Sequence, residues 1–163
     1  MEKEKTTKDS KSKIAKVEKS NLIAVIRIEG MVKVKSDIAN TLDRMRLRRK
    51  YACVLVNTND VAVMGMLKKV KQFVAYGLID KKILVDLIKN KGKNIEGDKK
   101  ELKVDVDKVA SDLLNGKKLS DLGLKPFFRL HPPRKGIKSK LHYPKGVLGD
   151  NKEDINKLIE RML

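Results

Sequence analysis

The sequence predicts an α+β fold: a small three-stranded sheet with helices packed on it, a helical insertion and basic extensions. Short apolar, β-branched segments bounded by turn residues recur along the chain, as in buried strands. Between them, apolar residues recur every three or four positions, as in helices that pack one face on a sheet. Because no internal repeat is evident, the chain is interpreted as one domain.

Three segments are predicted to be strands, at residues 22–28 (LIAVIRI), 51–56 (YACVLV) and 127–130 (FFRL). Two prolines follow the third segment, and they lack the backbone donor that a strand ladder needs. Arg27 is the one charge in the first segment, so it is expected at a strand end or on an edge. Whether neighbouring strands run parallel, as helical crossovers favour, stays open at this point.

Helices are predicted where apolar side chains follow helical spacing. The helical segments are residues 36–48, 60–76, 80–89 and 105–114, a brief turn at 120–123, and a C-terminal stretch that begins after Asp150 or Asn151.

Capping and breaking residues mark the ends of the first two helices. Ser36 and Asp60 suit N-cap positions, and Gly77 suits the end of the second helix. Gly65 lies inside that helix, where glycine costs about 1 kcal/mol relative to alanine. We therefore expect another backbone to approach closely at Gly65.

Shifts in composition divide the chain into five predicted parts. The parts are a basic flexible arm at 1–20, the first part of the α+β core at 21–90, an insertion with helices at 91–125, the third strand and a basic extension at 126–149, and a C-terminal helix at 150–163.

Charge is the strongest signal: 39 Lys and Arg residues against 21 Asp and Glu give a net charge of +18. Such a field opposes compaction until a polyanion neutralises it, so nucleic acid is the expected partner. A membrane surface and thermophile-style charging are the rival explanations, but the latter would match lysine with glutamate. No apolar stretch nears the roughly 20 residues that span a bilayer, and no signal peptide is evident. We therefore expect a cytoplasmic protein with no membrane partner.

Two basic clusters and one basic glycine loop are predicted to contact phosphates. At the end of the first helix, five cations fall within seven residues, more than a helix dipole needs. The second cluster, residues 134–145, has little to bury and is expected to take its shape from a partner. The predicted contacts are Arg44, Arg46, Arg48, Arg49, Lys50, Lys91, Lys93, Arg134, Lys135, Lys138 and Lys140.

The sequence shows no constellation of groups for catalysis. Its two histidines, His131 and His142, lie beside prolines or cations in basic loops, and the glycine motifs of nucleotide-binding proteins are absent. The single cysteine, Cys53, lies in an apolar run and is interpreted as a small core residue. We therefore predict no enzyme activity, metal, cofactor or small-molecule substrate.

Aromatic residues make up only 4% of the chain, which disfavours a surface that stacks a run of bases. Phe127 and Phe128 are neighbours in a predicted strand and point to opposite faces, so one could be exposed, but they form no stacking platform. What remains is recognition of the phosphates and shape of folded RNA.

Several runs of the sequence resemble one known family. LIAVIRIEG, the basic-ended helix, YACVLVNTND and MGMLKKVKQFVAYG resemble the universal family of large-subunit ribosomal proteins numbered thirty. LSDLGLKPFFRLHPPRKG resembles its archaeal and eukaryotic long form. The likeness covers about residues 20 to 149, and GMLKKV followed by FRLHPPRKG is its specific part.

The resemblance implies a largely antiparallel sheet related to ferredoxin-like folds, and binding to large-subunit ribosomal RNA beside neighbouring ribosomal proteins. Two departures are visible: Asn59-Asp60-Val61 replaces a frequent Asp-Thr-Pro, and Met64 replaces a frequent Arg before the helix glycine. The site residues that the resemblance implies are Arg44, Arg46, Arg48, Arg49, Gly65, Lys68, His131, Arg134, Lys135 and Gly136.

Three function classes are weighed. The leading hypothesis is a ribosome-bound, structural constituent of the large ribosomal subunit that binds ribosomal RNA through phosphates and shape. The alternative is a free-standing RNA- or DNA-binding chaperone, which would bind many nucleic acids with similar affinity. An RNA-processing enzyme would need an acid–base pair that the sequence does not show.

Overall fold

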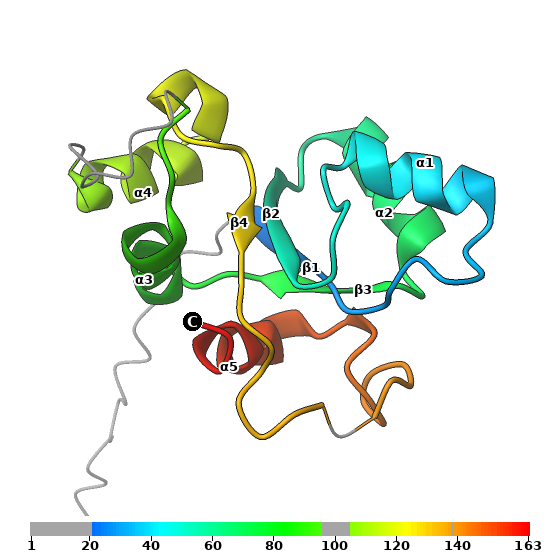
Figure 1. The fold of residues 1–163 in the computed structure, drawn as a ribbon. Helices are drawn as coiled ribbons and strands as arrows, with labels where there is room; N and C mark the ends of the chain where they lie inside the picture. The colour runs from blue at the N-terminus through cyan, green and yellow to red at the C-terminus, as the bar shows by residue number, and fades with distance from the viewer. Residues whose placement is uncertain (1–20, 96–104, 138) are drawn as a thin grey trace, which may run out of the picture.

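A five-stranded sheet forms the centre of the computed structural model, which describes residues 21–95, 105–137 and 139–163 (Figure 1). The strands are β1 (Leu22–Arg27), β2 (Ala52–Asn57), β3 (Val74–Leu78), β4 (Phe128–Arg129) and β5 (Gly149–Asp150). Their order across the sheet is β4-β2-β1-β3-β5. β1 pairs antiparallel with β2 and β3, and β4 pairs antiparallel with β2, whereas β5 runs parallel to β3. The sheet is therefore largely antiparallel, as the resemblance implied.

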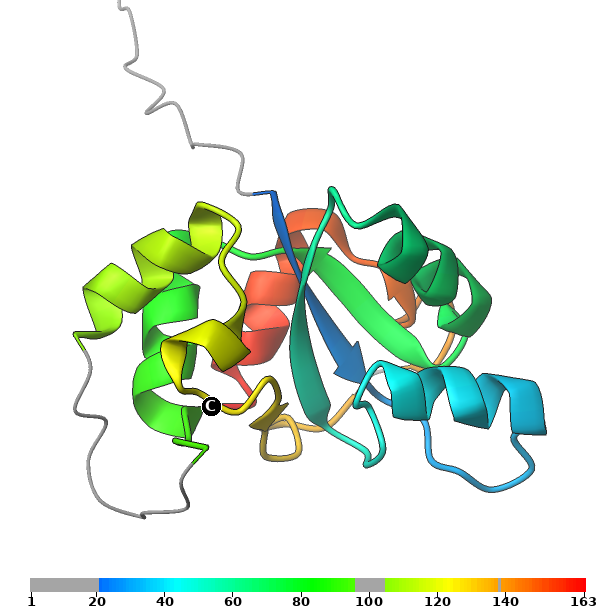
Figure 2. The same ribbon diagram turned by 90° about the horizontal axis from the view of Figure 1, so that it is seen from above.

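Helices cover both faces of this sheet (Figure 2). They are α1 (Ser36–Arg44), α2 (Val61–Val70), α3 (Lys81–Lys91), α4 (Val106–Leu114) and α5 (Ile155–Glu160), with short 3-10 turns η1 (Leu119–Leu122) and η2 (Lys152–Asp154). α1 and α2 pack on one face, α3 and α5 on the other, and α4 packs against α3.

Alternation along β1 explains why this strand lies at the centre. Ala24 and Ile26 belong to the core under α3, α4 and α5, whereas Ile23 and Val25 belong to the core under α1 and α2. Successive side chains of a strand point to opposite faces, so a fully apolar strand needs cover on both sides. All six residues of β1 are buried, in agreement with that requirement.

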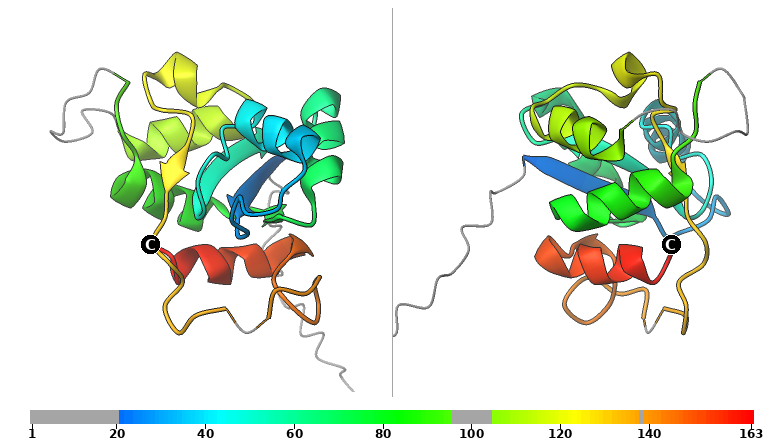
Figure 3. Two further views of the ribbon diagram at one scale, coloured as in Figure 1. Left: turned by 45° about the vertical axis from the view of Figure 1, so that its right-hand side comes forward. Right: turned by 90° about the vertical axis from the view of Figure 1, so that its left-hand side faces the viewer.

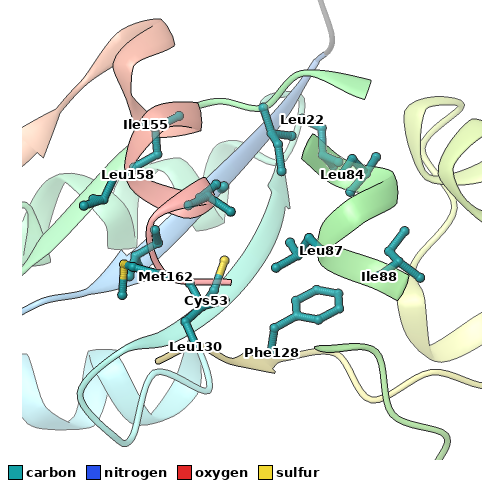
Figure 4. Packing of buried hydrophobic residues seen from close by; sticks show 14 of the residues in the cluster. Leu22, Cys53, Leu84, Leu87, Ile88, Phe128, Leu130, Ile155, Leu158 and Met162 are labelled. Carbon is teal, nitrogen blue, oxygen red and sulfur yellow. The ribbon is translucent and has the colours of Figure 1, made fainter. Parts of the chain in front are cut away.

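The larger core joins segments far apart in the sequence. Leu84, Leu87 and Phe128 meet the apolar face of α5 over the sheet (Figure 4). Cys53 lies in the same core, and burial raises the pKa of its thiol to about 12. The prediction of a small, inert core cysteine is confirmed, because the reactive thiolate is scarce at neutral pH.

The α+β class with helices packed on a small sheet is confirmed, but the sheet has five strands and not three. The predicted helix over residues 60–76 is wrong in its second half, because α2 ends at Val70 and 74–78 is β3. Val74 fits the helical spacing of apolar residues, yet it pairs with Arg27 in the sheet. Pairing with the central strand buries this segment, and that long-range contact overrides the local pattern.

Gly77 does not stop a helix, because it lies inside β3. A Cβ atom at this position would overlap the carbonyl oxygen of Lys152 and lie 3.0 Å from Ile155 Cγ2. Glycine is therefore required here to let η2 and α5 pack against the sheet. At Gly65 the expectation of a close backbone was wrong, since a Cβ atom added there would meet no described atom within 4 Å outside its own helix.

Smaller corrections concern the helix ends. The N-cap of α1 is Lys35 and not Ser36, and α1 ends at Arg44 rather than at residue 48. Arg46, with a φ of 61°, lies in the left-handed region, which stops the helix. Asp60 does occupy the N-cap of α2, although its side chain makes no capping bond within the described structure.

Most remaining elements agree with prediction, although β5 was not predicted. α3, α4, η1 and the C-terminal helix lie where helical spacing placed them, and the third predicted strand shortens to β4. The predicted arm at 1–20 and part of the predicted insertion, 96–104, lie outside the described residues. The division of the chain into five parts stays a prediction. No helix among the described residues is long and apolar enough to cross a membrane.

The two glycines provide a matched test of packing. We expect Gly77→Ala to destabilise the fold by roughly 1–3 kcal/mol or more, because the methyl group would displace the Lys152 backbone. Gly65→Ala, in open space on α2, should stabilise it by about 1 kcal/mol. Urea unfolding of both variants measures the difference, and equal stabilities would contradict the packing described here.

Candidate nucleic-acid interface

A buried arginine fixes the loops at the end of β1. The Arg27 side chain is 0% exposed, and its guanidinium donates to the backbone oxygens of Leu47 (2.7 Å), Arg48 (3.0 Å), Glu29 (2.9 Å) and Gly30 (2.9 Å). Burial lowers the pKa of Arg27, and Asp43 acts in the opposite direction. Sequence reasoning placed Arg27 at a strand end or on an edge, and it lies at the end of the central strand.

The loop between α1 and β2 is anchored from both ends. The backbone N–H of Leu47 donates to Leu42 (2.8 Å), and that of Tyr51 donates to the carbonyl of Arg27 (2.7 Å). Arg46 and Tyr51 both adopt left-handed φ values, 61° and 62°, which turn the chain sharply at each end of the loop. The loop therefore has a defined shape within the protein itself.

This loop exposes every cation that the sequence analysis assigned to the first cluster. Met45 and Leu47 are buried in the smaller core, and the cations between and after them point outward. Arg48 lies 3.5 Å from Asp43, but both side chains are well exposed, so the pair adds little stability and leaves Arg48 available. The exposed set is Arg44, Arg46, Arg48, Arg49 and Lys50, which we call the first basic loop.

β4 and the residue before it add Arg129 and Phe127, which the sequence analysis did not assign to the interface. Arg129 pairs with Ala52 across the sheet edge, which places it beside the first basic loop. Phe127, the residue before β4, and Arg129 both line a groove, whereas the intervening Phe128 is buried in the larger core. Together with the first basic loop they line one groove, bounded by Arg46, Arg48, Arg49, Lys50, Ala52, Phe127, Arg129 and Leu130. Alternation along the predicted strand could have pointed to Phe127 and Arg129. The sequence does not show, however, that this strand lies beside the first basic loop.

The second basic cluster continues from this groove. The backbone N–H of Leu130 donates to Tyr51 (3.0 Å), and that of His131 donates to Met162 (3.0 Å). The guanidinium of Arg161 donates to the carbonyls of Arg134 (2.8 Å) and Gly136 (2.5 Å). Contacts with the end of α5 thus hold residues 131–137 in place within the described structure (Figure 3), and the dependence of 134–145 on a partner stays a prediction.

The other predicted contacts are distributed differently. Lys140 forms an ion pair with Glu29 at 3.3 Å, so the second cluster returns to the end of β1 near Arg27. The carbonyl of Lys93 accepts from Lys125, two residues before Phe127. Gly65 and Lys68 are exposed on α2, and Lys91 is half-buried at the end of α3. Lys135 is exposed and has a left-handed φ. Lys138 lies outside the described residues.

Similarity to known proteins bears on identity. The model of the family described as ribosomal protein L30p/L7e matches residues 23–74, which span β1 to the start of β3 and include the first basic loop. A large ribosomal subunit protein uL30 of Methanococcus vannielii is 43% identical over 154 residues, covering 86% of this chain and 98% of that protein. The chain belongs to the ribosomal protein L30p/L7e family.

Further L30p/L7e relatives give the same result. The uL30 proteins of Archaeoglobus fulgidus and Desulfurococcus amylolyticus are each 40% identical, covering 86% and 87% of this chain and 99% and 98% of their own lengths. The resemblance stated from the residues is thereby confirmed. The L30p/L7e family is structural and not enzymatic, as predicted. Among the described residues, no group of three His, Cys, Asp or Glu side chains could hold a metal ion.

The role of Arg27 can be tested by replacing it. Arg27→Met keeps an apolar stem but leaves four backbone oxygens without the guanidinium, so we expect a loss of about 3 kcal/mol in the free energy of unfolding. Arg129→Met removes an exposed cation and should change stability by less than about 0.5 kcal/mol. Thermal and urea unfolding would measure the stability of both variants. If Arg27→Met were as stable as the Arg129→Met control, Arg27 would not anchor the loops.

Proposed function

We propose that this protein is a structural component of the large ribosomal subunit that binds ribosomal RNA. One observation carries the proposal: the first basic loop exposes five cations on a backbone that Arg27 holds in place. Cations on a fixed loop suit phosphates that occupy fixed positions in a folded RNA. The relatives are named as proteins of the large ribosomal subunit, which supports the choice of RNA.

The mechanism is neutralisation of phosphates combined with a match of shape. The first basic loop, Arg129 and the segment that starts at His131 follow one another around the end of β1. A surface of this kind can contact the backbones of neighbouring RNA helices and hold them together. The net charge of +18 would be relieved on binding, as counterions leave the RNA. Such a protein would be ribosome-bound in the cytoplasm, beside other ribosomal proteins.

Co-sedimentation with ribosomal subunits separates this proposal from the free-standing chaperone. We expect the tagged protein to remain with the large subunit, at about one copy, through a high-salt wash. A structural component is held by many shape-matched contacts, and not by charge alone. Release into the free fraction, or spreading over all RNA, would favour the chaperone.

The first basic loop makes a quantitative prediction. Replacing Arg46, Arg48 and Arg49 with alanine should weaken binding to large-subunit ribosomal RNA and flatten the plot of log affinity against log salt by about 2–3 units, at 0.7–0.9 per phosphate lost. The matched control removes the same charge from the exposed side of α3, with Lys81, Lys82 and Lys89 changed to alanine. An unchanged slope in the first variant would remove the loop from the interface.

A further inference from the structure

Phe127 is a large aromatic residue that neither hydrophobic core of the described structure includes. Its neighbour Phe128 is 1% exposed and belongs to the larger core, whereas Phe127, the residue before β4, lines the groove beside the first basic loop. The Phe127 side chain is half-buried and contributes to the lining of the groove. Part of its aromatic surface therefore stays available to a ligand in the groove.

The groove surrounds this ring with cations. The guanidinium carbon of Arg129 lies over the Phe127 ring, 5.7 Å from its centroid. Arg46, Arg48 and Arg49 line the same groove. Phosphate groups alone would be bound by these cations without any aromatic ring. The ring therefore indicates a ligand that has an aromatic face as well as a negative charge.

We infer that this groove binds one unpaired nucleotide of the RNA, with its base stacked on Phe127 and its flanking phosphates on the first basic loop. Bases that leave a helix at a bulge or loop stack on aromatic rings and on the planes of arginine guanidinium groups. Phe127 and Arg129 supply one of each in a single groove.

The inference rests on the proposed function and makes it more specific. The low aromatic content of the chain still disfavours binding to a long single strand, because a run of bases needs a run of rings. A single ring in a cationic groove is suited to a single base, held next to paired RNA that the cations contact. The expected ligand is a folded RNA with an unpaired nucleotide, and not a continuous duplex.

The test uses the full chain with two RNA probes: deproteinised large-subunit ribosomal RNA from Methanococcus vannielii, and a fully paired RNA duplex. Phe127→Leu should weaken binding to the ribosomal RNA by roughly 5- to 150-fold, the loss of one stacked base. It should leave duplex binding and the salt slope unchanged, because no charge is removed. The control, Tyr76→Leu, removes a half-buried aromatic ring of β3 that lies outside the groove and outside both basic clusters, and it should change neither affinity.

A second variant reports stacking directly. The chain contains no tryptophan, so Phe127→Trp introduces a single tryptophan at the proposed contact, and its fluorescence can be excited separately from that of the three tyrosines. Its emission should be quenched by the ribosomal RNA and not by the duplex. This variant keeps an aromatic ring, so it decides the question even if Phe127→Leu fails to fold.

The outcomes separate the inference from the proposed function. If the unaltered protein binds neither probe, the proposed function fails. If it binds ribosomal RNA with the expected salt slope, but Phe127→Leu binds equally well, the inference is overturned and the proposed function stands. Absence of quenching in Phe127→Trp, with binding intact, overturns the inference in the same way.

Discussion

The fold of this protein around its basic surface depends on one buried arginine. Arg27 ends the central strand, and its guanidinium bonds four backbone oxygens from two loops. A buried cation is tolerated only when its donors are satisfied, and a planar fork with several N–H groups can satisfy four carbonyls at once. Lysine has one donor atom and could not span the same set. The buried guanidinium of Arg27 thus fixes the backbone that carries the exposed cations of the first basic loop.

Local pattern predicted most of the fold, and long-range pairing explains where it failed. Apolar runs located β1 and β2, and helical spacing located α3 and α4, because each buries a face that its own sequence defines. The β3 segment failed because its apolar residues fit a continuation of α2. Its pairing with β1 and β5, and the packing of η2 against Gly77, distinguish the strand from the helix.

In the candidate site, too, local features could be predicted from the sequence and long-range ones could not. The first basic loop could be predicted, because a dense run of cations is local and the structure exposes all of them. Arg129 and Phe127 could not, because their importance depends on the pairing of β4 with β2, about 75 residues apart in the chain. Lys140 lay within a predicted cluster, but charge density alone does not reveal its ion pair with Glu29.

Both basic clusters meet at one end of β1, and this arrangement has an energetic consequence. The backbone oxygen of Glu29 accepts from Arg27, while its carboxylate pairs with Lys140, so one residue joins the two clusters. Ordering flexible side chains and loops on binding costs free energy that a preformed surface does not spend. In this protein the loops are ordered when the chain folds. Hydrogen bonds to backbone oxygens hold most of them, so the exposed cations are largely not needed for this. The exposed cations therefore keep their charge for an external partner, and the repulsion among them favours a polyanion at this end of the sheet.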